Sequence, residues 1–467
     1  MTTAAEFESR ALLPSFVSFP PSKTERTGNA ACHPPPPPTM IVRDLKRVIL
    51  LVGPLALLLL LSASLWHSGA GILSPLLGDD TDGTSSSAVV LRKPILTANK
   101  THYEIFSATS HDGKYYELRF GRHVFNPNIV PHPNFNNTWF VVGQMFNEPG
   151  DFDQSVHEAV CLAQFIKGVL MCIDYVKYLP IEPTKGDKCD GDLAYINFNV
   201  GPHDARVFMG PQSPYIIYGS NGKFTCFSQW IQDFRKLTDW EYELMTNTDF
   251  PLGTEIERPA PHFALEKNYF VFWDNYDEMH VHYDMHPKRG YSKLERNGSV
   301  GPNLAPKTTS SDEKCLQRYM PEMPKELESI HQASNSLKVT MCKRADKKCE
   351  PHDGNTYIMT IIQHKSYYGY HSEYEPYVVL FQQRSPFELY AISKKPLWIS
   401  GRQRHEGRKT DMMYVTSVNW RERGVKYHGY LDDVAFIGFG YEDRFSGAID
   451  VRMSDLLVDM GICDDEP

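Results

Sequence analysis

Short apolar runs separated by turn residues recur over most of the chain. In the stretch 201–219, a turn carrying Asp204 comes directly before one apolar run, and Tyr215–Tyr218 forms a second run across a Gly/Pro turn. Runs bounded in this way by Gly, Pro and Ser predict antiparallel β-strands. The same order of polar residues and apolar strand recurs at Glu266–Phe272 and Gly429–Phe436.

These runs form five clusters over roughly 350 residues, which fits an all-β, five-bladed β-propeller with insertions better than a sandwich of about 100 residues. In a propeller, polar loop groups at the same end of successive sheets meet over a central channel. The clusters lie at Tyr103–Gly143, Tyr195–Tyr218, Phe263–Tyr283, Thr356–Phe381 and Met412–Val451.

The remaining local patterns predict one hairpin and little helix. Tyr103–Ala108 and Tyr115–Phe120 flank a turn and predict a hairpin. Pro324–Leu337 contains helix formers and predicts a helical insertion between blades, and Ser454–Met460 predicts a terminal helical turn with Ser454 as its N-cap. The absence of β-α-β alternation and of a Gly-rich phosphate loop disfavours a nucleotide-binding α/β fold.

One uncharged apolar run, Val48–Trp66, is close to the ~20 residues that cross a bilayer as a helix. Three basic residues precede it and three acidic residues follow: Arg43, Lys46 and Arg47, then Asp79, Asp80 and Asp82. The positive-inside rule therefore predicts a cytosolic N-terminus and a single-pass type II anchor. A cleaved signal peptide is the alternative, which the long preceding tail disfavours.

This segment divides the chain into four predicted parts. They are a Pro-rich cytoplasmic tail at 1–47, the transmembrane helix at 48–66, a flexible stem at 67–102 and a lumenal propeller at 103–467. Together they predict a protein of the Golgi or another secretory-pathway membrane. The Pro34–Pro38 run favours an extended polyproline helix if it is ordered, and a disordered tail is the preferred interpretation.

Cysteines and glycosylation motifs agree with that topology. Of nine cysteines only Cys32 precedes the apolar run, so an even number follows it. An even number is typical of disulfide-bonded proteins in an oxidising compartment, but the sequence does not show which cysteines pair. Three N-x-S/T acceptors also lie on the predicted lumenal side: Asn99, Asn136 and Asn297.

The charge of the chain limits the kinds of partner that we expect it to bind. The net charge is −9 and no basic face is concentrated in the sequence, so we expect no nucleic-acid partner. Asp190-Gly191-Asp192 could hold a divalent cation, but it is more typical of a surface turn. We therefore predict no cofactor, and binding of a divalent metal ion stays an open alternative.

Four motifs follow one another along the chain: Asn126-Pro127-Asn128-Ile129-Val130, Asp204-Ala205-Arg206-Val207-Phe208, Glu266-Lys267-Asn268, and Leu431-Asp432-Asp433 with Gly438-Phe439-Gly440-Tyr441-Glu442-Asp443. Their order resembles that of the five-bladed sugar-processing propellers, which include mannoside phosphorylases and related mannosyltransferases. The segment Tyr427–Leu457 and the type II anchor most resemble the fungal β-mannosyltransferases. The resemblance runs from Tyr103 to the end and is patchy between Asn297 and Asn355.

The resemblance implies a β-mannosyltransferase that uses GDP-mannose and a glycan acceptor. The family's central turn is usually Glu-Asp-Pro-Arg, and here it is His203-Asp204-Ala205-Arg206, so the acid and the Arg match while their neighbours differ. The resemblance implies a catalytic role for Asp204. The resemblance also implies that a further set of residues binds substrate: Arg206, Glu266, Lys267, Asn268, and Asp432 or the equally placed Asp433.

The chemistry is consistent with these residues. Inverting transfer from an α-linked nucleotide sugar needs a base for the acceptor hydroxyl and cations for the departing phosphate. Asp204 could act as the base, with Arg206 and Lys267 as phosphate partners. Each residue also has a structural alternative: Asp204 could cap a turn, Arg206 could form an ion pair with a neighbouring blade, and Lys267 could face solvent.

Two other functions remain open on the same scaffold. A glycoside hydrolase or phosphorylase would need a second acid near Asp204 or a site for inorganic phosphate. A non-catalytic glycan-binding propeller would need neither.

Overall fold

The computed structural model describes residues 101–146, 156–198, 201–240, 248–323, 328–368, 371–405 and 409–464. The chain divides into two units, and all described residues belong to the unit that contains Val89–Pro467. The predicted tail, the anchor at 48–66 and nearly all of the stem lie outside the described residues. Within the described part, no helix combines the length and the apolarity needed to cross a bilayer.

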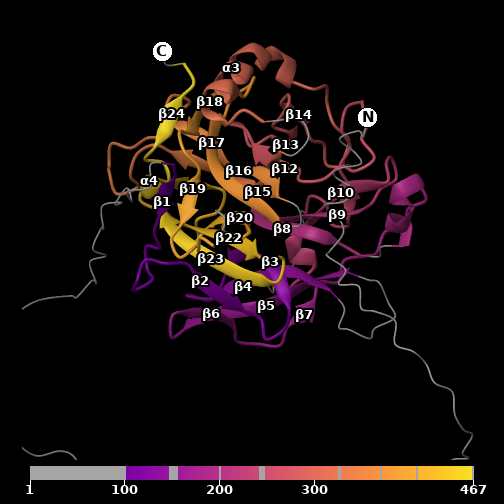
Figure 1. Ribbon diagram of the computed structural model, residues 1–467, viewed down its shortest axis with the longest axis horizontal. Coiled ribbons are helices and arrows are strands. Elements are labelled where there is room, and N and C mark those ends of the chain that lie inside the picture. Colours follow the sequence, from indigo (N-terminus) through magenta and orange to yellow (C-terminus); the bar gives the residue numbers. More distant parts are fainter. Residues whose placement is uncertain are drawn as a thin grey trace, which may run out of the picture. The chain divides into compact units, whose positions relative to one another are not determined.

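The described residues are mostly β, as the sequence predicted, and most of their strands pair antiparallel (Figure 1). We divide all but two of these strands into five groups according to their pairing. The first two groups each follow the chain order. Group one contains β3 (Val124–Pro131), β4 (Trp139–Phe146), β5 (Val156–Ile166) and β6 (Val169–Cys172), with β7 (Lys177–Tyr178) paired to β5. Group two contains β8 (His203–Met209), β9 (Pro214–Asn221), β10 (Phe227–Asp233) and β11 (Thr254–Glu255).

Group three also follows the chain order, whereas groups four and five recruit strands from distant parts of the chain. Group three contains β12 (Phe270–Trp273), β13 (Met279–Asp284) and β14 (Gly290–Lys293). Group four contains β15 (Glu328–Thr340), β16 (Thr356–Tyr368), β17 (His371–Gln382), β18 (Leu389–Ser393) and β24 (Met460–Ile462), with β21 (His428–Tyr430) parallel to β15. Group five contains β20 (Met413–Trp420), β22 (Val434–Tyr441), β23 (Phe445–Arg452) and β2 (Tyr116–Arg119).

Two strand pairings lie at the margins of these groups, and the helices are short. β2 also pairs in parallel with β6, which joins groups five and one into one sheet. β1 (Tyr103–Ile105) pairs in parallel with β19 (Leu397–Ile399). The helices of the described residues are η1 (Gly191–Phe198), η2 (Phe234–Lys236), η3 (Ala305–Lys307), α3 (Thr309–Tyr319) and α4 (Met453–Leu456).

The first strands of the five groups, β8, β3, β20, β15 and β12, are joined in that order by buried polar side chains. Asn128 Nδ2 donates to the Ala205 carbonyl at 2.9 Å, and Thr416 Oγ1 donates to the Pro127 carbonyl at 2.7 Å. The next two bonds continue the row: Asn335 Nδ2 to the Val418 carbonyl at 2.7 Å, and Ser336 Oγ to the Val271 carbonyl at 2.6 Å.

An aromatic contact closes the row. The ring centroids of Phe208 in β8 and Trp273 in β12 lie 6.3 Å apart, so the last of the five strands lies beside the first. Buried polar groups are costly unless they are hydrogen-bonded, and these side chains meet that need by bonding to the neighbouring strand. The five first strands therefore surround one axis, and their ends meet at two common faces.

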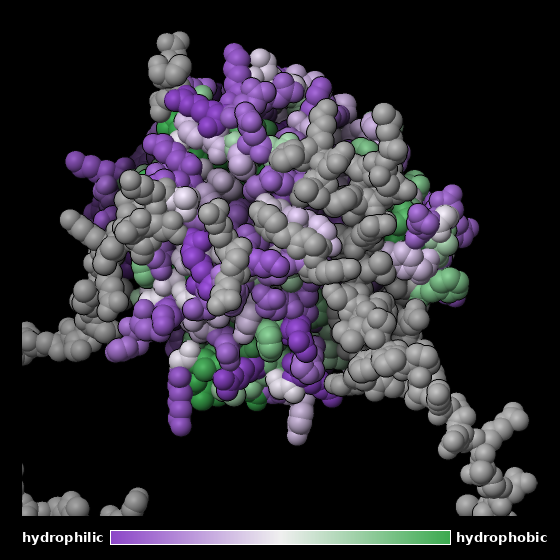
Figure 2. All heavy atoms as spheres, in the orientation of Figure 1, coloured by the Kyte–Doolittle hydropathy of each residue, from purple (hydrophilic) through white to green (hydrophobic). Residues whose placement is uncertain are grey.

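Apolar side chains fill the space between neighbouring groups. Between groups one and two, Val130 and Phe140 share a buried cluster with Val207 and Tyr218. The face shown in Figure 2 is mainly hydrophilic, and hydrophobic residues reach the surface at its lower edge, where β5 and β6 lie.

All eight cysteines of the predicted lumenal part are paired. The disulfides are Cys161–Cys172, Cys189–Cys226, Cys315–Cys463 and Cys342–Cys349. The third of these ties α3 to the end of β24 across 148 residues of sequence. Complete pairing is typical of a protein that folds in an oxidising compartment.

Three local predictions were wrong or incomplete. Tyr103–Ala108 and Tyr115–Phe120 form no hairpin, because β1 pairs with β19 while β2 pairs with β23 and β6. The described part of Pro324–Leu337 is not helical but belongs to β15, where pairing with β16 overrides helix propensity.

The predicted terminal turn is present as α4, but Ser454 is not its cap. The N-cap position is Arg452, and no side chain caps this helix. The sequence interpretation also missed α3, which begins after Thr308 without a side-chain cap.

Candidate functional site

Asp204 lies at a bulge near the start of β8. The pairing of β8 with β9 shifts register between His203 and Arg206, and Asp204 has a φ of 49°. Asp is among the few residues that visit this left-handed region readily, because its short polar side chain can bond locally. The bulge leaves the Asp204 side chain exposed at one face of the five first strands.

Three side chains of group one hold this bulge. Asp204 N–H donates to Gln144 Oε1 at 2.9 Å, and Ala205 N–H donates to Glu158 Oε1 at 3.0 Å. Gln144 and Glu158 face each other across β4 and β5, so the two acceptors are presented side by side. Asn126 Nδ2 donates to Asp204 Oδ1 at 2.9 Å and thereby orients the carboxylate itself.

Glu158 is the most deeply buried acid at this site, with 1% of its surface exposed. Burial raises its pKa to about 8; the Ala205 N–H opposes the shift, the charge of Asp204 adds to it and the charge of Arg206 opposes it. Its Oε2 atom has no hydrogen-bond partner among the described residues. Glu158 is therefore mainly neutral at pH 7, next to an exposed acid.

The Arg206 guanidinium donates hydrogen bonds to backbone carbonyls of its own turn and to a tyrosine hydroxyl. Its Nη1 donates to the carbonyls of Asp204 and Ala205 at 2.5 and 3.2 Å, and its Nη2 donates to Tyr414 Oη at 3.4 Å. Tyr414 Oη in turn donates to Asn268 Oδ1 at 3.3 Å. The structure thus brings Asp204, Arg206 and Asn268 together, and the contacts of Arg206 favour a role in holding the turn.

Two lysines lie near Asn268. Asn268 has a φ of 63°, and its Nδ2 lies 3.5 Å from His331 Nδ1. Burial, then the charges of Lys365 and Lys267, hold the pKa of His331 well below its ordinary value. Lys365 Nζ also lies 5.7 Å from the centre of the Tyr374 ring, which contacts the His331 ring edge-on. Lys267 therefore lies in the same cluster as Asn268, and a role in substrate binding stays a prediction for both.

Asp443 supplies a second carboxylate that the sequence interpretation did not select. It lies in the turn between β22 and β23 with a φ of 49°. Loss of solvent around the carboxyl raises its pKa, the charges of Asp204 and Glu442 add to the shift, and Lys365 opposes it. Asp204 is thus close enough to Asp443 for its charge to raise the pKa of the Asp443 carboxyl. Asp443 ends one of the four motifs of the resemblance, but the sequence does not show that its carboxylate lies near Asp204, which only the fold reveals.

Asp432 and Asp433 lie elsewhere. Asp433 Oδ2 pairs with Arg344 Nη2 at 2.6 Å, and Asp432 Oδ1 accepts the Arg344 N–H at 2.6 Å. These aspartates precede β22, whereas Asp443 follows it, and eight strand residues span about 26 Å. The structure therefore does not bring Asp432 and Asp433 to Asp204, because β22 carries the chain from one face of the molecule to the other.

Glu266 is also directed away from the cluster. Its carboxylate accepts hydrogen bonds from Arg258 Nη1 at 2.8 Å, Tyr269 Oη at 2.7 Å and the Phe263 N–H at 2.8 Å. We define the Asp204 cluster by the residues that do meet: Asn126, Gln144, Glu158, Asp204, Arg206, Lys267, Asn268, His331, Lys365, Tyr374, Tyr414 and Asp443.

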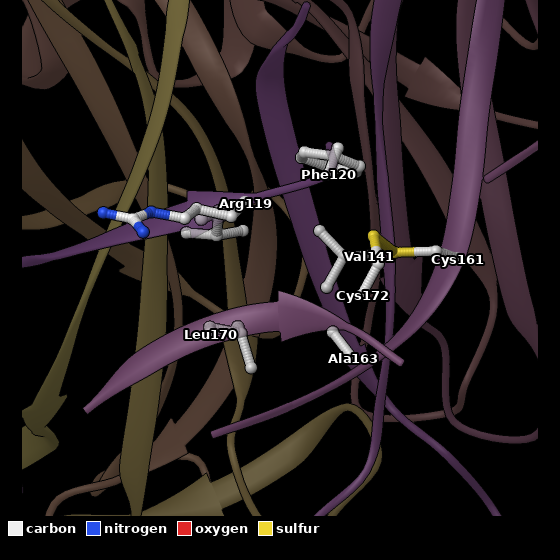
Figure 3. A pocket seen from close by; sticks show the side chains of 8 residues that line it. Arg119, Phe120, Val141, Cys161, Ala163, Leu170 and Cys172 are labelled. Atoms are coloured by element: carbon white, nitrogen blue, oxygen red, sulfur yellow. A yellow bond between two sulfur atoms is a disulfide. The ribbon is translucent and has the colours of Figure 1, made fainter. Parts of the chain in front are cut away.

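One apolar hollow, without room for a water molecule, lies apart from this cluster (Figure 3). Leu118, Phe120, Val141 and Leu170 line it together with the Cys161–Cys172 disulfide, and Arg119 points away from it. None of the Asp204 cluster lines this hollow. We interpret it as a packing gap where β2 and β6 meet.

The described residues contain no group of three or more His, Cys, Asp or Glu side chains placed to hold a metal ion. The prediction that no cofactor is needed stays a prediction. Asn136 and Asn297 are exposed, as a glycan acceptor must be, whereas Asn99 lies outside the described residues. Glycosylation at all three likewise stays a prediction.

No protein-family model and no curated protein sequence matches this chain. Solved structures of similar shape include a β-1,2-mannobiose phosphorylase from Listeria innocua, with 10% identity, a TM-score of 0.38, and coverage of 72% of this chain and 91% of that chain. A GDP-Man-dependent mannosyltransferase from Leishmania mexicana matches with 10% identity, a TM-score of 0.34, and coverage of 72% and 88%.

A glycosyl hydrolase from Bacteroides ovatus matches with 9% identity, a TM-score of 0.35, and coverage of 74% of this chain and 90% of that chain. At such identities and TM-scores these likenesses carry no argument about the activity of this chain. The functional conclusion has to come from the Asp204 cluster.

Proposed function

We propose that this chain is an inverting glycosyltransferase that moves mannose from GDP-mannose to a glycan acceptor and forms a β-linkage. The observation that carries the proposal is the exposed Asp204 carboxylate at a left-handed bulge. Asn126, Gln144 and Glu158 hold that bulge from the neighbouring strand group. Catalytic groups need such fixed geometry, because a misplacement of about 1 Å can cost a hundredfold in rate.

In this mechanism Asp204 accepts the proton of the acceptor hydroxyl. The acceptor oxygen forms a bond to the anomeric carbon of mannose while the bond from that carbon to the β-phosphate oxygen breaks. GDP leaves with the electron pair of that bond and needs no protonation. Lys267 and Lys365 belong to the Asp204 cluster, and their charges favour a substrate that carries phosphate.

We further propose that the five strand groups are the blades of a propeller, with the Asp204 cluster over its axis. The row of hydrogen bonds through the first strands supports this interpretation. A type II anchor at 48–66 and a Golgi location remain part of the proposal, and the complete disulfide pairing is consistent with a lumenal position.

Asp443 supports a second candidate function. Two carboxylates whose environments separate their pKa values are typical of glycoside hydrolysis, in which one acts as acid and the other as base. The pKa of Asp443 is raised, and Asp204 contributes to that shift. A hydrolase or phosphorylase would use Asp443 to protonate a sugar leaving group, whereas a nucleotide leaving group makes that proton unnecessary.

The test compares two reactions of the full-length protein. We expect transfer from GDP-mannose to a mannoside acceptor, with loss of at least a hundredfold in kcat in Asp204→Asn, because general base catalysis contributes about 10²–10⁴. Asp239→Asn is the matched control, since the Asp239 side chain is 91% exposed and only distantly paired.

If the protein cleaves a β-mannoside with water or inorganic phosphate and does not use GDP-mannose, the second candidate function is correct and the transferase proposal is wrong. Saccharide binding without any turnover by the wild type would favour a glycan-binding protein.

A further inference from the structure

Tyr414 connects two other parts of the Asp204 cluster through its hydroxyl group. It lies near the start of β20, in group five, whereas Arg206 belongs to β8 of group two and Asn268 precedes β12 of group three. Arg206 Nη2 donates to Tyr414 Oη at 3.4 Å, and Tyr414 Oη donates to Asn268 Oδ1 at 3.3 Å. Neither candidate function uses this hydroxyl as a reacting group, so its place in the cluster needs another explanation.

The chemistry of the side chains fixes the direction of these hydrogen bonds. A guanidinium can only donate, so Tyr414 Oη accepts from Arg206 and has its own proton left to donate to Asn268 Oδ1. The Asn268 amide then directs its Nδ2 donor to His331 Nδ1, 3.5 Å away. Because burial holds the pKa of His331 well below its ordinary value, the ring is neutral and Nδ1 can accept. The orientation of the Asn268 amide therefore depends on the Tyr414 hydroxyl.

The surroundings of Tyr414 keep its hydroxyl protonated and its ring in place. Burial raises the pKa of Tyr414 to about 12; the charge of Arg206 opposes the shift and the charge of Asp204 adds to it. The hydroxyl therefore keeps its proton at neutral pH. The ring meets that of Tyr374 edge-on with the centroids 4.8 Å apart, and the Arg206 guanidinium carbon lies 5.8 Å from the Tyr414 ring centre. Removal of the hydroxyl alone leaves both of these ring contacts possible.

Each end of this hydrogen-bonded chain holds one part of the proposed reaction centre. At one end, Arg206 Nη1 donates to the Asp204 carbonyl at 2.5 Å and holds the turn that carries the proposed base. At the other end, Asn268 directly follows Lys267, whose charge favours phosphate in the proposed mechanism. The Asn268 carbonyl accepts from Gln332 Nε2 at 3.2 Å, which holds the backbone of that segment. Tyr414 Oη thus links the turn of the base to the segment of the lysine.

We propose that Tyr414 is a positioning residue that fixes the spacing between Asp204 and Lys267. Transfer requires the acceptor oxygen, as it loses its proton to Asp204, to approach the anomeric carbon while Lys267 faces the departing phosphate. A misplacement of about 1 Å can cost a hundredfold in rate, so a link between the two residues has a large effect on turnover. This role rests on the proposed function, because it assumes a reaction that uses both residues.

Tyr414→Phe tests this role, because it removes the hydroxyl and keeps the ring. In the full-length protein we expect kcat for mannosyl transfer to fall about ten- to a hundredfold. KM for GDP-mannose should change less than about threefold, because Lys267 itself is intact. Tyr427→Phe is the matched control, since the Tyr427 hydroxyl also makes two hydrogen bonds, with the Trp273 N–H at 3.3 Å and Ser336 Oγ at 3.0 Å, outside the Asp204 cluster. The control should leave kcat and KM unchanged.

A double variant separates positioning from a general loss of structure. If Tyr414 acts through Asp204, adding Tyr414→Phe to Asp204→Asn should lower the residual kcat by less than about threefold further. A further loss of tenfold or more in the double variant would overturn the proposal, as would equal falls of kcat in Tyr414→Phe and Tyr427→Phe. If Tyr414→Phe does not fold, Asn268→Gly takes its place, because it removes the accepting amide and Gly adopts the φ of 63° without strain. The same fall of kcat is then expected, and an unchanged kcat would overturn the proposal.

The activity of the wild type distinguishes failure of this inference from failure of the proposed function. Transfer that Tyr414→Phe leaves unchanged overturns the positioning role and retains the transferase. Cleavage of a β-mannoside without use of GDP-mannose overturns the transferase, and the fall of kcat in Tyr414→Phe is then measured in that cleavage, in which Asp204 also acts. A wild type that turns over neither substrate overturns both.

Discussion

The neutral state of Glu158 makes the stability of this protein depend on pH in a defined direction. Burial raises the pKa of Glu158 from 4.5 to about 8 in the folded protein. Between these values the folded state binds one proton more than the unfolded state, so the free energy of unfolding falls as pH rises. The slope for one proton is about 1.4 kcal/mol per pH unit, which gives about 2 kcal/mol between pH 6 and 7.5.

Glu158→Gln removes this dependence. The amide oxygen of Gln can still accept the Ala205 N–H, and the side chain no longer titrates. We expect wild type to lose about 2 kcal/mol relative to Glu158→Gln between pH 6 and 7.5. Urea unfolding of the full chain with intact disulfides, followed by tryptophan fluorescence, measures the difference at each pH. Taking the difference cancels groups that titrate equally in both proteins.

Glu117→Gln is the control, since the Glu117 side chain is 50% exposed on β2 and should give a difference that does not vary with pH. A constant offset between wild type and Glu158→Gln from pH 6 to 7.5 would refute the reasoning, because it would mean that Glu158 is already ionised in the folded protein. A growing advantage of wild type with rising pH would refute the sign.

Three further predictions follow from the same structure. Asp312→Ala should destabilise the protein by about 3–5 kcal/mol in urea unfolding, because it leaves the buried Arg289 guanidinium unpaired; a loss below 1 kcal/mol would contradict a buried pair. Replacing Cys315 and Cys463 together by Ser should cost about 2–5 kcal/mol in the same assay, and an unchanged midpoint would argue against that disulfide. Asp443→Asn should lower kcat for mannosyl transfer less than tenfold if GDP leaves unprotonated, whereas a loss of a hundredfold or more in a steady-state assay would assign Asp443 an acid–base role.

The candidate site was only partly visible in the sequence. Asp204, Arg206, Lys267 and Asn268 could be selected because they belong to motifs that resemble those of the sugar-processing propellers, and each motif lies where polar residues meet an apolar strand. Asp432 and Asp433 met the same criterion, yet they lie at the other end of β22 from Asp443. The two ends of a strand lie at opposite faces of the molecule. The local sequence does not show which of these ends lies at the face that carries the site.

The mainly β class could be predicted from the amino-acid sequence alone, because apolar runs bounded by turn residues are present whatever the arrangement of the strands. The even number of cysteines in this part likewise showed that they could all pair. Three features could be seen only in the folded chain: β1 joins β19, the helix formers before Leu337 form a strand, and Gln144 and Glu158 hold Asp204. Each of these depends on contacts between residues far apart in sequence, where packing and the hydrogen-bonding needs of buried groups outweigh local preference.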